Sequence, residues 1–112
     1  MSLKKVFFAI LSVLALAGFA FATPAFAADG GQLFNANCAS CHGGGANYVV
    51  APKTLQDDAM KQYLTGYTDD PAGAISYQII HGKGSMPGFG RLKPDEVDAI
   101  TAYVIEQAEK GW

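Results

Sequence analysis

Cys38, Cys41 and His42 belong to the sequence Cys-Ala-Ser-Cys-His, which holds both cysteines of the 112-residue chain and one of its two histidines. Cysteines three positions apart lie about one helical turn from each other, so both sulfur atoms can reach a single bound group. A disulfide between them would close only a very short loop and would remove little chain entropy. This motif constrains the fold more than any other feature, because the chain has to be built around what these residues hold.

The first 27 residues have the three parts of a secretory signal peptide. Lys4 and Lys5 form the positive start, an apolar run follows at 6–22, and Ala25-Phe26-Ala27 has the small-large-small pattern of a cleavage site. We therefore expect residues 1–27 to be removed during export.

A membrane anchor is the alternative interpretation of the same stretch. Residues 6–28 contain no charged side chain and are long enough to cross a bilayer. Thr23-Pro24 interrupts the apolar run, however, and the cleavage pattern follows at once, so removal is favoured. The mature protein is then expected to be one domain at 28–112 that is not embedded in the membrane.

The mature domain is small and acidic. Without Lys4 and Lys5, six basic residues remain against ten acidic ones, which gives a formal charge of −4. A nucleic-acid partner is not expected, because binding to phosphates needs a basic face. A domain of about 85 residues buries a modest share of its surface, so a bound group or a cross-link is expected to reinforce it.

The spacing of apolar residues predicts an all-α domain of about four helices joined by glycine-rich loops. The first helix is short and runs from about residue 30 into the cysteines. The second is expected to have Thr54 as its N-cap and to stop at Gly66.

The two later helices carry clearer boundary signals. Asp70 is a capping residue, Pro71 suits the first helical position, and Gly82 follows the end of the third helix. The fourth helix is predicted over 94–110, with an acidic first turn and a lysine and a glycine at its other end. No comparably long alternating run predicts β-strands.

The spacing of Cys38, Cys41 and His42 is that of c-type haem attachment. Each thiol can form a thioether with one of the two haem vinyl groups, and His42 can then bind the iron as the proximal ligand. The sequence therefore predicts one covalently attached haem c.

Three other uses of the two thiols remain open from the residues alone. A Cys-x-x-Cys redox disulfide usually lies in a βαβ setting, which this helical pattern lacks. A zinc site could recruit Cys38, Cys41, His42 and His81, although adjacent Cys41 and His42 do not match the usual separated ligand pairs. The third is a plain structural disulfide, which would leave the chain without haem.

The sixth iron ligand decides between electron transfer and small-molecule chemistry, because an open iron can bind or activate ligands. Met86 lies in the loop Gly-Lys-Gly-Ser-Met-Pro, which can bring its sulfur to the iron, although a loop methionine can equally fill a gap. Met60 is expected in the core of the second helix. His81 is the rival ligand and would lower the reduction potential; otherwise it meets solvent at a helix end.

Taken together, these segments resemble class I cytochromes c, and within them the cytochrome c6 family. The similarity covers the mature chain and rests on the order of NCASCHGGG, APKTL, ISYQIIHGKGSMPGF and AYVIEQAEKGW. It implies a small class I cytochrome c fold in which the helices wrap around one haem c. It also implies Cys38 and Cys41 as the covalent attachments, His42 as the proximal iron ligand and Met86 as the distal one.

The resemblance carries an expectation for packing as well. The first and last helices are expected to cross, with Gly30, Phe34 and Tyr103 near their contact. The chain departs from the family at two points, because His81 stands where asparagine is frequent and the loop over 89–91 is one residue shorter. Both departures concern the loop that follows the third helix.

The function and the partners are also implied by the resemblance. Members of the family carry electrons from the cytochrome bf complex to photosystem I, and in cyanobacteria also to a terminal oxidase. We expect a soluble, monomeric electron carrier of the thylakoid lumen or periplasm, and not an enzyme. Gln78 matches the glutamine that tunes the haem potential, while Arg91 and Lys83 match residues of the docking surface. The alternative is a low-potential carrier of the family, or a haem-based sensor, with a different or open sixth ligand.

Overall fold

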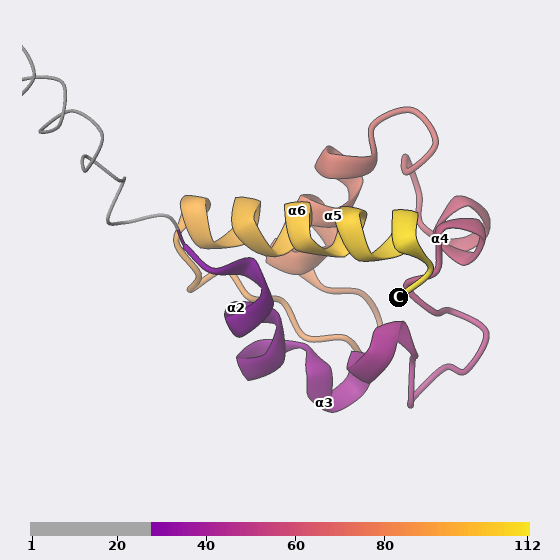
Figure 1. Cartoon of the computed structure of the whole chain (residues 1–112), viewed down its shortest axis with the longest axis horizontal. Coiled ribbons are helices and arrows are strands. Elements are labelled where there is room, and N and C mark those ends of the chain that lie inside the picture. Colours follow the sequence, from indigo (N-terminus) through magenta and orange to yellow (C-terminus); the bar gives the residue numbers. More distant parts are fainter. Residues whose placement is uncertain (1–27) are drawn as a thin grey trace, which may run out of the picture.

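The computed structural model describes residues 28–112, and the expected signal peptide lies outside the described residues. Figure 1 shows helices joined by long loops, and the described part contains no strand. The elements are α2 (Gly30–Asn37), α3 (Ala39–His42), the 3₁₀ helix η1 (Gly43–Gly45), α4 (Asp57–Tyr63), α5 (Pro71–His81) and α6 (Pro94–Lys110). The prediction of an all-α fold is confirmed. Within these residues, no helix is both long and apolar enough to cross a membrane.

The boundaries of α5 and α6 agree with the sequence signals. The Asp70 side chain caps α5 by accepting a hydrogen bond of 3.0 Å from the backbone N–H of Gly73. Pro71 is the first residue of α5 and Gly82 follows its end. These helices were predictable because local groups satisfy the free backbone donors of their first turn.

The first predicted helix is interrupted at Cys38. This residue has φ −120° and ψ −33°, so α2 ends at Asn37 and α3 begins at Ala39. The backbone N–H groups of Cys41 and His42 both donate to the Cys38 carbonyl, at 3.1 and 2.9 Å. The described part therefore has five α-helices instead of four, because the motif forms a separate turn with its own hydrogen bonds.

The predicted limits of the second helix are wrong. α4 begins at Asp57, three residues after Thr54, and ends at Tyr63 before Gly66. The reason is tertiary: the Leu55 N–H donates to the Gly45 carbonyl at 2.7 Å, and the Leu55 carbonyl accepts from the indole of Trp112, also at 2.7 Å. These contacts keep Leu55 out of α4. An N-cap at Thr54 would have made Leu55 the first residue of the helix.

The expected crossing of the first and last helices is confirmed. A Cβ atom at Gly30 would clash with the backbone of Ala99 in α6, so only glycine permits this close approach. One turn later, the rings of Phe34 and Tyr103 lie 5.3 Å apart between centroids. Trp112 extends this aromatic contact, with its ring 5.4 Å from that of Phe34. The α2–α6 crossing thus fixes the position of the cysteine motif that follows α2.

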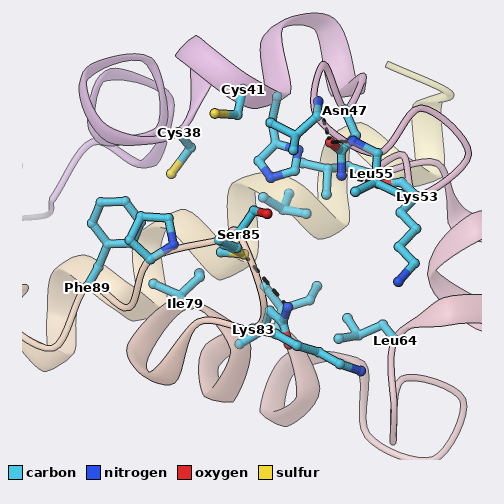
Figure 2. Close-up of a pocket in the computed structure, with 18 of the residues that line it drawn as sticks. Cys38, Cys41, Asn47, Lys53, Leu55, Leu64, Ile79, Lys83, Ser85 and Phe89 are labelled. Atoms are coloured by element: carbon cyan, nitrogen blue, oxygen red, sulfur yellow. Dashed lines mark hydrogen bonds between the residues drawn. The ribbon is translucent and has the colours of Figure 1, made fainter.

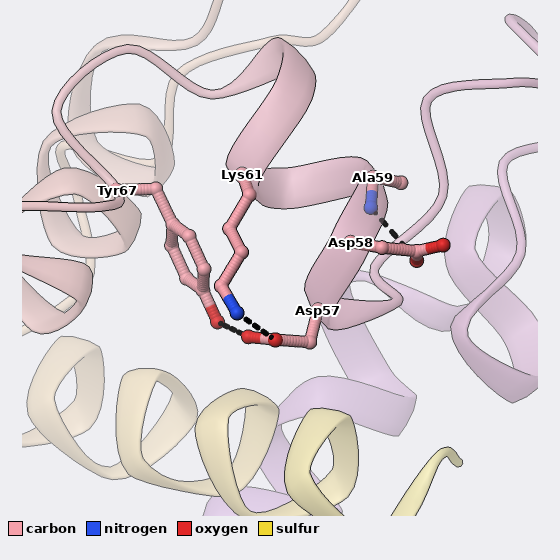
Figure 3. Close-up of polar contacts among 5 residues, drawn as sticks. All are labelled: Asp57, Asp58, Ala59, Lys61 and Tyr67. Carbon is pink, nitrogen blue, oxygen red and sulfur yellow. Dashed lines mark hydrogen bonds and ion pairs between the residues drawn. The ribbon is translucent and has the colours of Figure 1, made fainter.

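Tyr67 anchors α4 to the turn that follows it. Its side chain is buried, and its hydroxyl donates a hydrogen bond of 2.8 Å to one carboxylate oxygen of Asp57 (Figure 3). Lys61 binds the other oxygen at 2.7 Å. The pKa of Tyr67 is raised to about 12, mainly by burial and secondly by the hydrogen bond to Asp57. The hydrogen bonds from Lys61 and then Tyr67 lower the pKa of Asp57.

Replacing Tyr67 with phenylalanine is expected to lower the free energy of unfolding by about 1 kcal/mol at neutral pH, the usual contribution of one such hydrogen bond. Because the pKa of Tyr67 is raised in the folded state, its contribution is complete below pH 10 and is lost as the pH rises towards 12. Denaturant titrations at pH 7 and above pH 10 check this. The difference in the free energy of unfolding between wild type and Tyr67→Phe should shrink at high pH. Tyr77 is exposed, so Tyr77→Phe should have the same free energy of unfolding as wild type at both pH values. A constant difference would contradict the assignment.

Candidate functional site

A cavity of about 500 Å³ opens between the cysteine motif, the loop over 47–55, α4, α5, the loop over 82–89 and α6. This volume lies within the range of small-molecule and cofactor sites. Aliphatic, aromatic and sulfur-containing side chains form most of its walls. In Figure 2, Cys38 and Cys41 extend from the N-terminal segment, while Lys83 and Ser85 belong to the loop that forms another side.

Both cysteines line this cavity. Cys38 is half-buried and Cys41 is exposed, and neither is in a disulfide. Burial raises the pKa of the Cys38 thiol above its ordinary value. Their common position on one wall fits the attachment of a single group at two points, and it gives no support to a cross-link that stabilises distant parts of the chain.

The imidazole of His42 has its two nitrogen atoms in different settings. Nδ1 lies 2.9 Å from the carbonyl oxygen of Ala46, and a carbonyl can only accept a hydrogen bond. In the neutral ring Nδ1 therefore carries the proton, and the lone pair of Nε2 is free to bind a metal. A backbone carbonyl on the other ring nitrogen is the usual means of orienting a metal-binding histidine. His42 lines the cavity, so its geometry suits an iron ligand.

Met86 is the last residue of a tight turn that begins at Lys83. The backbone groups of Lys83 and Met86 exchange two hydrogen bonds of 3.0 Å. Gly82 and Gly84 both have positive φ, and a Cβ atom at Gly82 would clash with the Met86 carbonyl, so the turn requires glycine there. This geometry places Met86 among the residues that line the cavity.

Gln78 lies on α5 and also lines the cavity. Its side-chain amide donates a hydrogen bond to the sulfur of Met86, with 3.7 Å between Nε2 and Sδ. The structure thus places Gln78 beside Met86.

His81 lies away from these groups. Its side chain is exposed and is not among the cavity residues. Nδ1 lies 2.9 Å from the Tyr77 carbonyl, and the imidazole stacks on the Tyr77 ring at 4.0 Å between centroids. Moreover, no cluster of three or more His, Cys, Asp or Glu side chains within 28–112 is arranged to hold a metal. The zinc alternative and ligation by His81 therefore find no support.

The two residues expected to dock partners are both exposed. Lys83 lines the rim of the cavity. Arg91 is outside it, with its guanidinium carbon 5.0 Å from the centroid of the Phe89 ring, and Phe89 is itself part of the cavity wall. Arg91 thus contacts a ring of the cavity wall without lining the cavity itself.

Sequence reasoning missed Asn47, which organises the loop that closes one side. Its side-chain oxygen accepts from the backbone N–H groups of Val49 and Val50 at 3.0 and 2.8 Å, and its amide donates to the Lys53 carbonyl at 2.9 Å. Asn47, Val49, Val50 and Lys53 all line the cavity. The signal for this role is the preference of asparagine for bonding its own backbone two residues on.

The residues of this cavity fit a haem c. Two cysteines three positions apart can provide thioether attachment, and His42, with a free Nε2, and Met86 line the same cavity. The largely apolar walls suit a porphyrin ring. The residues that line the cavity therefore fit a covalently attached haem c.

Comparisons with known proteins agree with this fit. A family model described as cytochrome c oxidase, cbb3-type, subunit III, matches residues 25–104. The chain is 51% identical to cytochrome c6 of Limnospira maxima over 76% of this chain and 97% of the relative. It is 49% identical to cytochrome c6 of Picosynechococcus sp. over 97% of this chain and 98% of the relative.

Solved structures give the same result. The crystal structure of cytochrome c6 from the diatom Phaeodactylum tricornutum matches with a TM-score of 0.70 and 46% identity, over 74% of this chain and 94% of that one. Cytochrome c6C from Synechococcus sp. matches with a TM-score of 0.66 and 38% identity, over 74% and 98% of the two chains. The protein is an electron-transfer protein with one covalently bound haem c, and not an enzyme. The chain therefore belongs to the cytochrome c6 family of class I c-type cytochromes.

Proposed function

We propose that this protein carries single electrons from the cytochrome bf complex to photosystem I, using a haem c ligated by His42 and Met86. The observation that carries the proposal is that the free Nε2 of His42 and the sulfur of Met86 belong to the same cavity as both cysteines. Bound haem c supplies a one-electron couple, and ligation by a thioether sulfur closes the iron to small molecules.

The chain's own residues hold this couple in place. The Ala46 carbonyl orients the His42 ring and makes Nε2 a stronger donor. The double hydrogen bond between Lys83 and Met86 fixes the loop that carries the sulfur. Because both ligands are held before oxidation or reduction, little has to move when the charge changes, which favours rapid electron transfer.

Gln78 is proposed to tune the reduction potential through its contact with Met86. Replacing Gln78 with leucine removes a polar group from a largely apolar cavity, which disfavours the more highly charged ferric state. The reduction potential is expected to rise by tens of millivolts, since about 59 mV corresponds to 1.4 kcal/mol for one electron. Redox titration checks this, with Gln56→Leu, a change outside the cavity, as the control. A lower or an unchanged reduction potential in Gln78→Leu would refute the tuning role.

Partner docking is proposed for the surface around Arg91 and Lys83. Both side chains are exposed beside the cavity, and neither forms an ion pair within residues 28–112. Free cations on an otherwise acidic protein can steer it towards a negatively charged partner. We propose that the mature protein is a soluble monomer of the thylakoid lumen or periplasm after removal of residues 1–27, and that it can also serve a terminal oxidase.

Flash-induced reduction of photosystem I by the purified holoprotein tests this function, with Arg91→Glu as the decisive variant. The second-order rate constant is expected to fall about threefold to tenfold at low salt, and its salt dependence to flatten, because charge steering is lost. Lys110→Glu is the matched control because it makes the same reversal of charge at the far end of α6. Lys110 is about 24 Å along the helix from Pro94, which follows Arg91 by three residues. Unchanged kinetics of Arg91→Glu at low salt would remove Arg91 from the docking surface.

A further inference from the structure

The backbone between His42 and the carbonyl that orients its ring is made of glycine alone. The Ala46 carbonyl lies 2.9 Å from Nδ1 of His42, and the three residues of η1, Gly43–Gly45, separate the two. Glycine restricts the backbone less than any other residue, and η1 has no side chain with which to anchor itself. The Tyr48 hydroxyl donates to the Gly43 carbonyl at 3.2 Å, but this contact is exposed to water. The position of the Ala46 carbonyl therefore depends on contacts made to η1 by other segments.

Trp112 makes such a contact at the end of η1. Its indole lies directly against Gly45, where a Cβ atom would clash with the ring, and Gly45 has a positive φ of 78°. The indole N–H also donates to the Leu55 carbonyl at 2.7 Å, while the Leu55 N–H donates to the Gly45 carbonyl at 2.7 Å. In Figure 1, the end marked C lies beside the segment that follows α3. One side chain thus covers Gly45 and also binds the residue that holds the Gly45 carbonyl.

The indole is itself held by the two helices that cross. The Trp112 N–H donates to the Gln107 carbonyl of α6 at 2.8 Å. The Phe34 ring of α2 lies 5.4 Å from the indole between centroids, and the Tyr103 ring of α6 meets it edge-on at 6.1 Å. Such aromatic pairs have preferred geometries, so they restrict the orientation of the ring. Trp112 therefore connects the flexible η1 to the rigid α2–α6 crossing.

We propose that Trp112 is a positioning residue for His42, which fixes η1 so that the Ala46 carbonyl accepts a hydrogen bond from Nδ1–H and thereby lowers the reduction potential. The inference rests on the proposed ligation of the iron by His42. A metal-binding histidine whose other nitrogen donates to a carbonyl is a stronger donor, and hydrogen bonds of this kind tune haem potentials. A stronger donor stabilises the ferric state more than the ferrous state. Loosening η1 is therefore expected to raise the potential.

Trp112→Ala tests this role in the holoprotein with two measurements that report on His42. NMR of the reduced, diamagnetic protein gives the rate at which the Nδ1 proton of His42 exchanges with solvent, and we expect this rate to be about tenfold higher, the effect of losing one hydrogen bond. A redox titration gives the potential. We expect the equilibrium constant for reduction to increase about threefold, which is about 28 mV at 59 mV per tenfold change for one electron.

Val97→Ala is the matched control. Val97 is buried at the start of α6, about 20 Å along the helix from Lys110, and it does not line the cavity. Its truncation lowers the free energy of unfolding without touching η1. The potential is expected to match that of wild type, and the exchange rate to stay within about twofold of it. If Trp112 only stabilised the fold, Trp112→Ala and Val97→Ala would affect His42 alike.

The outcomes distinguish the inference from the function on which it rests. A Trp112→Ala protein with the exchange rate and potential of Val97→Ala would overturn the positioning role and leave the proposed function standing. Wild-type spectra in which the His42 ring protons lack the upfield shift of a ligand above a porphyrin would overturn the proposed function itself. If Trp112→Ala does not fold with haem, Trp112→Phe decides, because it keeps a ring but loses the hydrogen bond to Leu55. Its exchange rate is expected to rise about threefold, and wild-type values would overturn the inference.

Discussion

Replacing Met86 with alanine is expected to abolish the weak far-red band that a sulfur–iron bond gives in the oxidised visible spectrum, and to lower the reduction potential strongly. Axial ligands set haem potentials over a span of about 0.8 V, so a fall on the order of 0.1–0.3 V is expected when the thioether is lost. The open iron should then bind carbon monoxide when reduced. Visible spectra of both oxidation states and a redox titration measure these effects.

Met60→Ala is the matched control for this experiment. Met60 is a buried methionine of α4 that also lines the cavity, and its loss should cost stability, about 2–5 kcal/mol, without removing the far-red band. If the band survives in Met86→Ala, the sixth ligand is another group. The low-potential or sensor alternatives would then replace the proposed role.

The double variant Cys38→Ala/Cys41→Ala is expected to yield a chain without haem that does not fold cooperatively. Without haem, the apolar walls of the cavity of about 500 Å³ would lose the group against which they pack and would face water. A domain of about 85 residues has little stability to spare for this loss. Thermal unfolding followed by circular dichroism, together with the dispersion of NMR resonances, would report the loss of the folded state.

Ser40→Ala is the control for the cysteine variant, because Ser40 lies between the two cysteines and touches the same cavity without attaching the cofactor. It should retain the haem spectrum and unfold cooperatively. A double cysteine variant with dispersed resonances and a sharp unfolding transition, but no haem, would show that the apolar core suffices without the porphyrin.

Local sequence signals predicted the helices whose ends are satisfied locally. The Asp70 side chain caps α5, and Glu96 accepts a hydrogen bond of 2.9 Å from the Lys93 N–H at the start of α6. Such contacts span three residues, so the sequence contains all the groups involved. Thr54 failed as a start signal because residues distant in sequence, Gly45 and Trp112, bind the backbone of Leu55.

The candidate site also has a part that was predictable from local sequence and a part that depends on contacts between distant residues. The spacing of Cys38, Cys41 and His42 predicted one covalently attached haem c, because two thiols three positions apart and the histidine that follows them can reach a single bound group. Only the tertiary structure decided that Met86 faces the cavity whereas His81 stacks on Tyr77 outside it. Which side chain reaches a cavity depends on how a loop is folded back on its helix, and packing between distant segments, not local pattern, sets that direction.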